Sequence, residues 1–322
     1  MTRLTYLCLY IAHNKKESDY FFTEIENYQW TPHDTPHTIY YIALHSTIHS
    51  RRNGVWKWQD GILEGPLYQS SAKNWNSIFQ SCLRHLLPKH FDGFIYSGHG
   101  GTVSIGSWFR NSSAFLKISN LISLFVKYNM TFPVMLFNSC YMGGLLSLLE
   151  CNRITSWVAA DPGYSGWESI TNTSSFWKRS GAIGPWLSAS VHEYAHRFPR
   201  CPYKCYMAFD LHVLPALFRE LKKTDPMKWA WKKKYLLSSY DTSTYDLLSV
   251  LKDEKKLVQL IHHMMRFSVT CDKKKGPSIQ WGRITHMEYR YEGTIWWDYW
   301  KNINTCTVSS TLSENKLNVS IK

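Results

Sequence analysis

The sequence predicts a three-layer α/β/α sandwich, in which helices cover both faces of a mainly parallel central sheet. Short apolar runs of strand length alternate with segments of helical periodicity, as in sheets whose parallel strands are joined by crossover helices. Two of the apolar runs stop at a reactive side chain with glycines within four positions, and parallel sheets place their functional groups at the carboxyl ends of strands. The 322 residues are enough for one large domain or two small ones.

Strands are expected where β-branched or aromatic runs are bounded by turn residues. The first run is apolar and rich in tyrosine, and it is much shorter than the ~20 residues that span a bilayer. Residues 54–65 carry two tryptophans and an Asp60-Gly61 pair, which suggests a hairpin insertion. The predicted strands are residues 4–12, 38–45, 93–97, 133–138, 156–160 and 278–281.

Helices are expected where apolar residues recur every three or four positions. Pro88 supplies a stop signal after one such segment, and Pro199 supplies another. The predicted helices are residues 19–28, 72–87, 114–128, 145–149, 186–198, 208–223 and 245–267. We therefore expect one domain over residues 1–306, with a core over 1–170 and a helical elaboration over 171–306, followed by a polar tail over 307–322.

The composition is that of a folded globular protein, with 44% hydrophobic and 19% charged residues. The net charge is +13, from 37 basic and 24 acidic side chains. Basic runs such as 232–234 and 273–275 are typical of solvated faces, and no motif of a nucleic-acid-binding fold accompanies them, so nucleic acid is left unsupported as a partner.

The eight cysteines lie in a long chain without a convincing signal peptide. This predicts reduced thiols and an intracellular, cytoplasmic location. No apolar run is long enough for a membrane span, and the oligomeric state stays open.

Residues 95–101 (IYSGHGG) end an apolar strand on His99. A histidine at an exposed strand end can serve as a general acid or base near neutral pH, and its flanking glycines allow a substrate to approach closely. Taken alone, this segment is as well explained by a tight turn.

Residues 135–140 (MLFNSC) end the next apolar strand on Cys140, and residues 145–149 continue as a helix. We expect Cys140 to open that helix, where the positive potential of the N-terminus favours a thiolate. A buried structural cysteine is the alternative. The separation of 41 positions between His99 and Cys140 fits one helix with its loops, which would place the two groups on adjacent strands as a thiol–imidazole pair.

This pattern resembles the clostripain-like cysteine peptidases of the caspase-like group. In that family a His-Gly pair ends one strand, and a Cys within a Phe-Asp-Ala-Cys-Leu-Met segment ends the next. Residues 137–142 read FNSCYM here, and residues 157–167 (WVAADPGYSGW) fit the strand that leads to the family's Gly-Trp turn. The resemblance extends weakly over most of the chain and is specific in its middle third.

The resemblance implies a caspase-like fold and an endopeptidase that hydrolyses peptide bonds without a cofactor. Cys140 would attack the carbonyl and form an acyl-enzyme, and His99 would protonate the leaving amine and then activate water. The backbone N–H groups of Gly100 and Cys140 would hold the oxyanion, while Tyr141 and Met142 support the turn. The implied partner is a peptide or protein substrate.

One departure from the family bears on specificity. The family's Asp two places before the Cys lines a pocket that prefers Arg or Lys at P1, the substrate residue before the cleaved bond. Asn138 stands there instead and carries no charge. Asp161 is a candidate replacement at the end of the next strand, or simply a turn residue before Pro162. We take Asn138 and Asp161 as candidate substrate-binding residues and leave the P1 preference open.

Residues 192–196 (HEYAH) match the H-E-x-x-H pattern of zinc peptidases. On a helix this spacing puts His192 and His196 on one face with Glu193 as base. A third ligand is required, and Glu220 is the candidate. Cys201, Cys205 and His212 form a weaker constellation, and we assign no metal site.

The sequence thus favours a cysteine endopeptidase with a His99–Cys140 dyad. Two alternatives stay open: a catalytically inactive caspase-like protein that binds peptides or a partner through the same groove, and a zinc metallopeptidase that uses residues 192–196. Activation by self-cleavage is a further hypothesis, with Arg51-Arg52 and Lys178-Arg179 as exposed basic candidates.

Overall fold

The computed structural model describes residues 3–12, 16–17, 19, 36–45, 52–72, 74–86, 90–101, 104–106, 115–163, 170–179, 181–197, 206–225, 228–229, 232, 237, 244–269 and 276–280. These ranges contain a nine-stranded sheet in the order β12-β10-β9-β8-β5-β1-β2-β3-β4. Its strands are β1 (Leu4–Ala12), β2 (His37–His45), β3 (Gly54–Gln59), β4 (Ile62–Gln69), β5 (Gly93–Ser97), β8 (Met135–Asn138), β9 (Trp157–Ala160), β10 (Tyr206–Asp210) and β12 (Met265–Val269).

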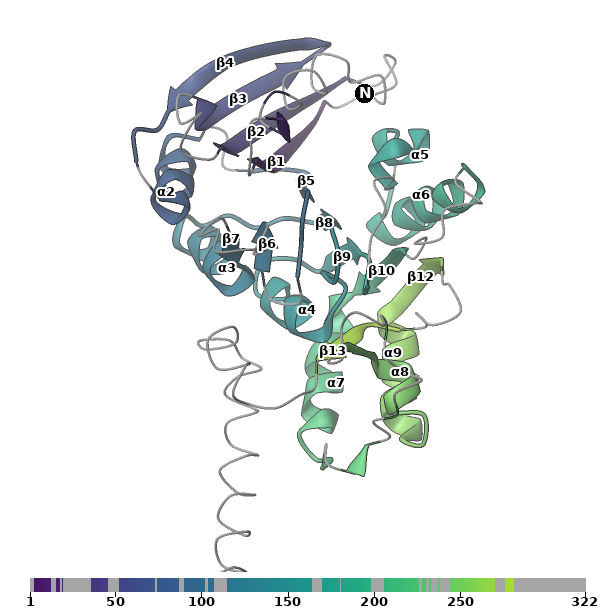
Figure 1. The fold of residues 1–322 in the computed structure, drawn as a ribbon. Helices are drawn as coiled ribbons and strands as arrows, with labels where there is room; N and C mark the ends of the chain where they lie inside the picture. Colours follow the sequence, from purple (N-terminus) through teal and green to yellow (C-terminus); the bar gives the residue numbers. More distant parts are fainter. Residues whose placement is uncertain are drawn as a thin grey trace, which may run out of the picture.

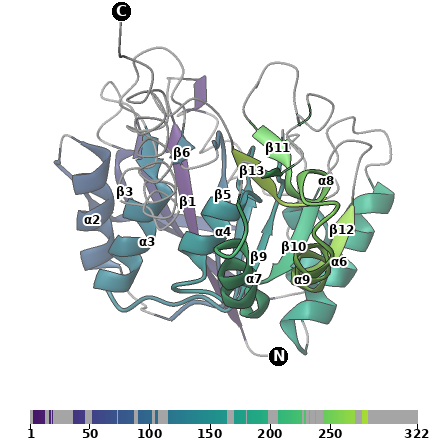
Figure 2. The same ribbon diagram turned by 90° about the horizontal axis from the view of Figure 1, so that it is seen from below.

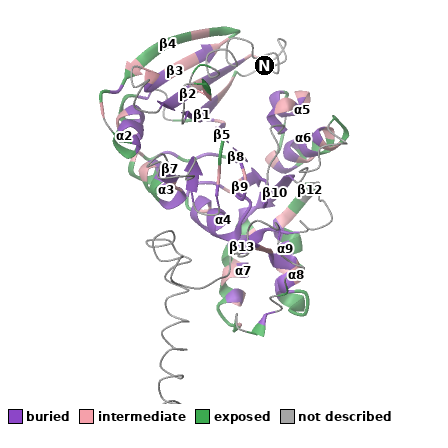
Figure 3. Cartoon of the chain, in the orientation of Figure 1, coloured by how far each residue is buried: buried purple, intermediate pink, exposed green. Residues whose placement is uncertain are grey.

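The five central strands run parallel, and antiparallel strands extend the sheet at both edges. Strands β2, β1, β5, β8 and β9 pair in parallel, whereas β3 and β4 extend one edge and β10 and β12 the other. The predicted hairpin insertion is therefore the β3–β4 edge of the main sheet. β4 is largely exposed, while the central strands are buried (Figure 3).

Helices cover both faces of the sheet. One face carries α2 (Trp75–His85), α3 (Ile118–Lys127), α4 (Leu145–Cys151), α7 (Leu214–Leu221) and α9 (Lys255–Met264) (Figure 2). The other face carries α5 (Ser174–Trp177) and α6 (Ile183–Arg197) (Figure 1). The predicted three-layer α/β/α fold with a mainly parallel central sheet is confirmed.

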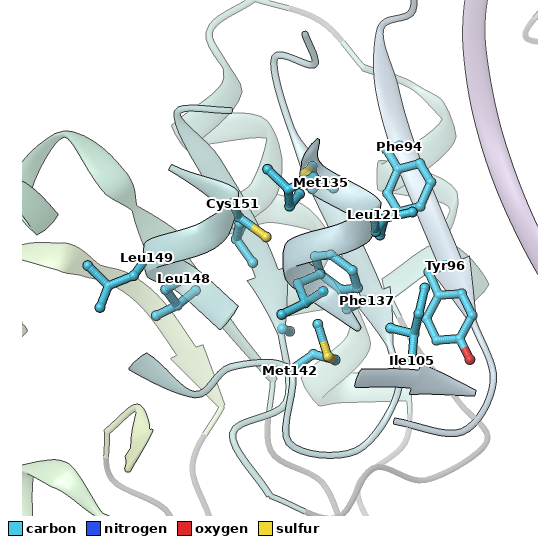
Figure 4. Close-up of a cluster of buried hydrophobic side chains, with 14 of the residues drawn as sticks. Phe94, Tyr96, Ile105, Leu121, Met135, Phe137, Met142, Leu148, Leu149 and Cys151 are labelled. Atoms are coloured by element: carbon cyan, nitrogen blue, oxygen red, sulfur yellow. The ribbon is translucent and has the colours of Figure 1, made fainter. Parts of the chain in front are cut away.

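The layers follow from the period-two alternation of strand side chains. On β1, Leu7, Leu9 and Ile11 face the α2–α3–α4 side, and Tyr6 and Cys8 face the α5–α6 side. Figure 4 shows part of the core on the first side, where side chains of β5 and β8 pack against α3 and α4. Because both faces are covered, the central strands read as nearly continuous apolar runs.

Several predicted elements are shorter than the sequence suggested, and three predicted helices include strand residues. The helix predicted over 114–128 begins with β7 (Phe115–Lys117) before α3, and the one over 208–223 begins with the last residues of β10 before α7. The one over 245–267 divides into β11 (Thr244–Asp246), α8 (Leu247–Val250), α9 and part of β12. All five β10 residues are buried. An apolar run buried on both faces has no period that separates strand from helix.

The remaining short elements are β6 (Ser104–Gly106), β13 (Ser278–Gln280) and two 3₁₀ turns, η2 (Ile170–Asn172) and η3 (Leu211–Val213). The helix predicted over 19–28 lies outside the described residues beyond position 19. Among the described cysteines (8, 82, 140 and 151) no disulfide forms. No helix in the described ranges combines the length and apolar character that crossing a bilayer requires.

Candidate active site

The carboxyl ends of β5 and β8 bring His99 and Cys140 to one edge of the sheet. The two strands pair in parallel with Ser97 opposite Asn138. His99 lies two residues after Ser97, and Cys140 lies two residues after Asn138. The Gly98 N–H donates to the Asn138 carbonyl at 3.2 Å. The adjacency expected from their spacing is thus built by the sheet. The His99 side chain is exposed and Cys140 is half-buried, so solvent reaches the edge at which both lie.

Gly100 marks the closest approach between the two strand ends. A Cβ atom at this position would lie 2.6 Å from the Cys140 carbonyl oxygen and 2.9 Å from both side-chain atoms of Ser139. Since side-chain carbons do not approach a backbone oxygen this closely, only glycine fits here without moving one of the chains. The glycine after His99 therefore has a steric reason in the contact with the Cys140 turn.

The Gly100 backbone N–H points away from its paired strand. Gly100 and Ile105 form an antiparallel bridge, in which the His99 carbonyl accepts from Gly106 N–H and the Gly101 N–H donates to Ser104, both at 2.8 Å. In such a pair the central residue turns its own N–H outward. This donor is thereby kept out of the β6 ladder, as an oxyanion-binding group has to be.

The phenol of Tyr96 holds the main chain of His99. Its Oη donates to the His99 carbonyl at 2.6 Å and accepts from the Gly106 N–H at 2.9 Å. Burial raises the pKa of the Tyr96 phenol well above its ordinary value, so the hydroxyl keeps the proton that it donates. Tyr96 was predicted only as a strand residue, because alternation reveals a buried ring but not the partner of its hydroxyl.

The Cys140 turn differs from the prediction. α4 begins at Leu145 with Gly144 as N-cap, so Cys140 lies in a turn several residues before the helix. The helix potential falls off within about the first turn, and it therefore does not explain activation of this thiol. The sequence indicates an apolar helix after Gly143 and Gly144, but it does not reveal the turn between Cys140 and that helix. In this turn Tyr141 adopts a φ of +62°.

Hydrogen bonds from the segment after β9 hold this turn. The Tyr141 N–H donates to the Gly163 carbonyl at 2.7 Å, and the Gly143 N–H donates to the Asp161 carbonyl at 2.8 Å. A left-handed conformation at a non-glycine residue costs on the order of 1–3 kcal/mol and persists only where its surroundings fix it. Two backbone hydrogen bonds to the loop after β9 thus fix the turn that carries Cys140.

Asn138 lies in a polar cluster contributed by four elements. Its Nδ2 donates to Ser97 Oγ at 2.9 Å and to Thr171 Oγ1 at 3.3 Å, while Tyr206 Oη donates to its Oδ1 at 2.9 Å. Burial, followed by the nearby Tyr194 and Asp161, raises the pKa of the Tyr206 phenol, so this group stays neutral. The three groups that these hydrogen bonds join to Asn138 are therefore hydroxyls without charge.

Asp161 is buried at the end of β9, and its Oδ1 accepts from the Gly163 N–H at 2.7 Å. This contact is the turn interaction that an aspartate two residues upstream commonly makes. Two of the candidate site residues thus lie close to the Cys140 turn with different surroundings: Asn138 faces hydroxyl groups, and Asp161 braces the loop that holds the turn.

Residues 192–196 lie on α6, on the opposite face of the sheet from α4. Glu193 does not face an open site. Its two carboxylate oxygens accept from the Ser174 and Ser175 N–H groups at 3.0 and 2.8 Å and from the Ser174 hydroxyl. This carboxylate caps the first turn of α5, which removes it as the free base that a zinc peptidase needs.

The other predicted metal ligands are also engaged or not described. Glu220 pairs with Lys223 at 2.8 Å and with Lys256 at 3.1 Å, and His212 pairs with Asp210 at 2.8 Å. Cys201 and Cys205 lie outside the described residues. Within the described ranges, no three His, Cys, Asp or Glu side chains are grouped to hold a metal ion.

Of the basic pairs considered for self-cleavage, one is held in place. The Arg179 guanidinium donates to the Asp92 carbonyl at 2.8 Å and lies 5.2 Å from the Trp186 ring centre. A protease requires an extended, accessible segment, so the structure disfavours cleavage after Arg179. Arg51 is outside the described residues, and the Arg52 guanidinium pairs with Asp19 at 2.8 Å.

Comparison with known proteins identifies the fold. No protein-family model matches the sequence, and neither does any curated protein. An inactive zymogen of a C11 protease from Parabacteroides distasonis superposes with a TM-score of 0.68 at 12% identity, over 93% of this chain and 98% of that one. A secreted C11 cysteine protease from Bacteroides thetaiotaomicron, in complex with an irreversible peptide inhibitor, gives 0.63 at 11% identity, over 94% and 100%.

The chain therefore has the fold of the C11, clostripain-like cysteine proteases. The structural resemblance predicted from the motifs is confirmed at this level, over nearly the whole of both chains. At 11–12% identity the comparisons concern the fold, and the chemistry has to be argued from the residues at the strand ends.

Proposed function

We propose that this chain is a cysteine endopeptidase whose nucleophile is Cys140 and whose general acid and base is His99. One observation supports this most: β5 and β8 pair in register, so His99 and Cys140 follow neighbouring strand ends, and Gly100 packs against the Cys140 carbonyl. The fold shared with C11 proteases supports the same reading.

In the proposed reaction, His99 takes the proton of the Cys140 thiol as Sγ attacks the substrate carbonyl carbon. The carbonyl oxygen becomes an oxyanion, which the N–H groups of Gly100 and Cys140 stabilise. Collapse breaks the C–N bond, and His99 gives its proton to the leaving amine. His99 then takes a proton from water, which attacks the thioester, and the carboxylic acid product leaves as the thiol is regenerated.

Rigid support of both strand ends is what the structure adds to this proposal. Tyr96 holds the His99 carbonyl, and the loop after β9 holds the Tyr141 N–H. Reactive groups kept in a fixed arrangement react faster because little freedom is lost on the way to the transition state. We infer that the reaction is favoured by these positioning contacts and not, as the sequence suggested, by a helix N-terminus at Cys140.

For specificity, we propose that the P1 pocket is uncharged at Asn138. The amide lacks the charge that would pair with Arg or Lys, and its Nδ2 already donates to Ser97 and Thr171. Asp161 directs Oδ1 to its own loop. We therefore expect no strong preference for a basic P1 residue. The predicted cytoplasmic location stays a prediction.

The test is cleavage of a peptide library diversified at P1, followed by mass spectrometry, with wild type, Cys140→Ala and His99→Ala. The proposal predicts cleavage by wild type alone. His262→Ala is the matched control, since this exposed histidine lies on α9 outside the candidate site. Folded wild type that cleaves no peptide, or cleavage that survives Cys140→Ala, contradicts the proposal, and the first result favours the binding-protein alternative.

A further inference from the structure

The two histidines of the HEYAH segment are left unexplained by the proposed peptidase. α6 buries Trp186, Leu187, Val191 and Tyr194 against the sheet. His192 and His196 project into solvent instead, one helical turn apart. Their Nε2 atoms lie 3.1 Å from each other, so both rings turn the same nitrogen toward a single point.

That separation matches two ligands of one metal ion. With metal–nitrogen bonds of about 2.0–2.1 Å, a right angle at the metal separates the nitrogens by roughly 2.9 Å and a tetrahedral angle by roughly 3.4 Å. The observed distance falls between these limits. Without a metal, the Nε2–H of one ring has to donate a hydrogen bond to the Nε2 of the other. When the donor ring changes to the tautomer that carries its proton on Nδ1, both Nε2 atoms present lone pairs, and a metal ion can take the place of the shared proton.

We propose that His192 and His196 bind one divalent transition-metal ion through their Nε2 atoms, with water completing the coordination. Imidazole favours Zn²⁺, Ni²⁺ and Cu²⁺ over Mg²⁺ or Ca²⁺. The site is not a catalytic zinc centre, because Glu193 caps α5. It lies on the face of the sheet opposite α4, and its two histidines take no part in the proposed peptidase reaction.

The position of the site gives metal binding a structural consequence. Between the two histidines, Glu193 holds the first turn of α5, and next to His196 the Arg197 guanidinium donates to the Asn172 carbonyl at 2.7 Å. A metal that joins the two rings fixes the helical turn from which both contacts are made. Binding to the folded state also stabilises it by mass action.

The experiment is calorimetric titration with Ni²⁺ of the full chain, without an added histidine tag, in wild type, His192→Gln and His196→Gln. Both side chains are exposed, so neither substitution disturbs the core, and circular dichroism checks the fold. The matched controls are His262→Gln and His263→Gln. These histidines are also exposed on a helix, but adjacent positions point in different directions and cannot share an ion.

We expect one Ni²⁺ site of wild type to weaken at least tenfold in each of His192→Gln and His196→Gln and to persist in both controls. Wild type should also gain about 1–3 °C in Tm at tenfold excess over Kd, a shift that both α6 variants lose. Binding that is the same in wild type and either α6 variant overturns the proposal, and so does wild type that binds no Ni²⁺ below millimolar concentration.

Discussion

Replacing Gly100 by alanine probes the contact on which the proposed dyad depends. The added Cβ would lie 2.6 Å from the Cys140 carbonyl oxygen, whereas an ordinary contact begins at 3.4 Å. The strand ends therefore have to separate by about 0.8 Å. The added Cβ is bonded directly to the backbone and the oxygen is part of it, so neither atom can rotate out of the contact. A displacement near 1 Å costs on the order of 10²-fold in rate, and overpacking costs about 1–3 kcal/mol of stability.

The assay is kcat/KM for a peptide found in the library, with urea unfolding to measure the stability change. Gly181→Ala is the control, because Gly181 has a φ of +70° with no atom within 4 Å of an added Cβ. It should lose about 1 kcal/mol through backbone strain and keep its activity. Gly100→Ala that retains kcat/KM within threefold of wild type refutes the reasoning.

Three further substitutions test the surroundings of the site. Tyr96→Phe removes the hydroxyl that holds the His99 carbonyl; we expect about 1–2 kcal/mol less stability and roughly tenfold lower kcat at similar KM, and an unchanged kcat contradicts the positioning role. Asn138→Asp places a charge in the proposed P1 pocket and should raise cleavage after Arg or Lys on the order of tenfold; an unaltered P1 profile in the library assay would remove this residue from the pocket. Glu193→Gln tests the α5 cap through its dependence on pH. Burial raises the pKa of Glu193, but the hydrogen bonds from Ser175 and Ser174 together hold this pKa below its ordinary value of 4.5. The ionised carboxylate therefore stabilises the fold above pH 4.5, and this contribution is lost as the pH falls through the lowered pKa. Urea unfolding should show the variant about 1 kcal/mol less stable at pH 7, with the difference vanishing in acid, and a pH-independent difference contradicts the cap.

The parallel centre of the sheet could be predicted because its physical cause is local. Strands such as β5 and β8 are apolar throughout and end at glycine or polar residues, so length and boundary signals identify them. β10 has the same apolar character, but it precedes a helical segment without a break, and periodicity alone merged the two. Which apolar run adds to the sheet is decided by tertiary pairing.

For the candidate site, the sequence identified the residues but not the contacts that place them. His99 and Cys140 follow from the strand ends and the glycines. The phenol of Tyr96, the Thr171 hydroxyl beside Asn138 and the support of the Tyr141 turn come from elements far apart in the chain. No local pattern encodes such hydrogen bonds, since a buried tyrosine or threonine looks the same whichever group it meets.

Covalent labelling of Cys140 tests the central proposal most directly. An acyloxymethyl ketone peptide reacts with a cysteine that a neighbouring base activates, and peptide mapping by mass spectrometry locates the adduct. Two described cysteines should not compete, because burial raises the pKa of Cys82 to about 12 and that of Cys151 still further. The account predicts one adduct at Cys140 in wild type, none in Cys140→Ala, and at least tenfold slower labelling in His99→Ala; labelling of Cys140 at the same rate without the imidazole, or no labelling of folded wild type, would contradict it.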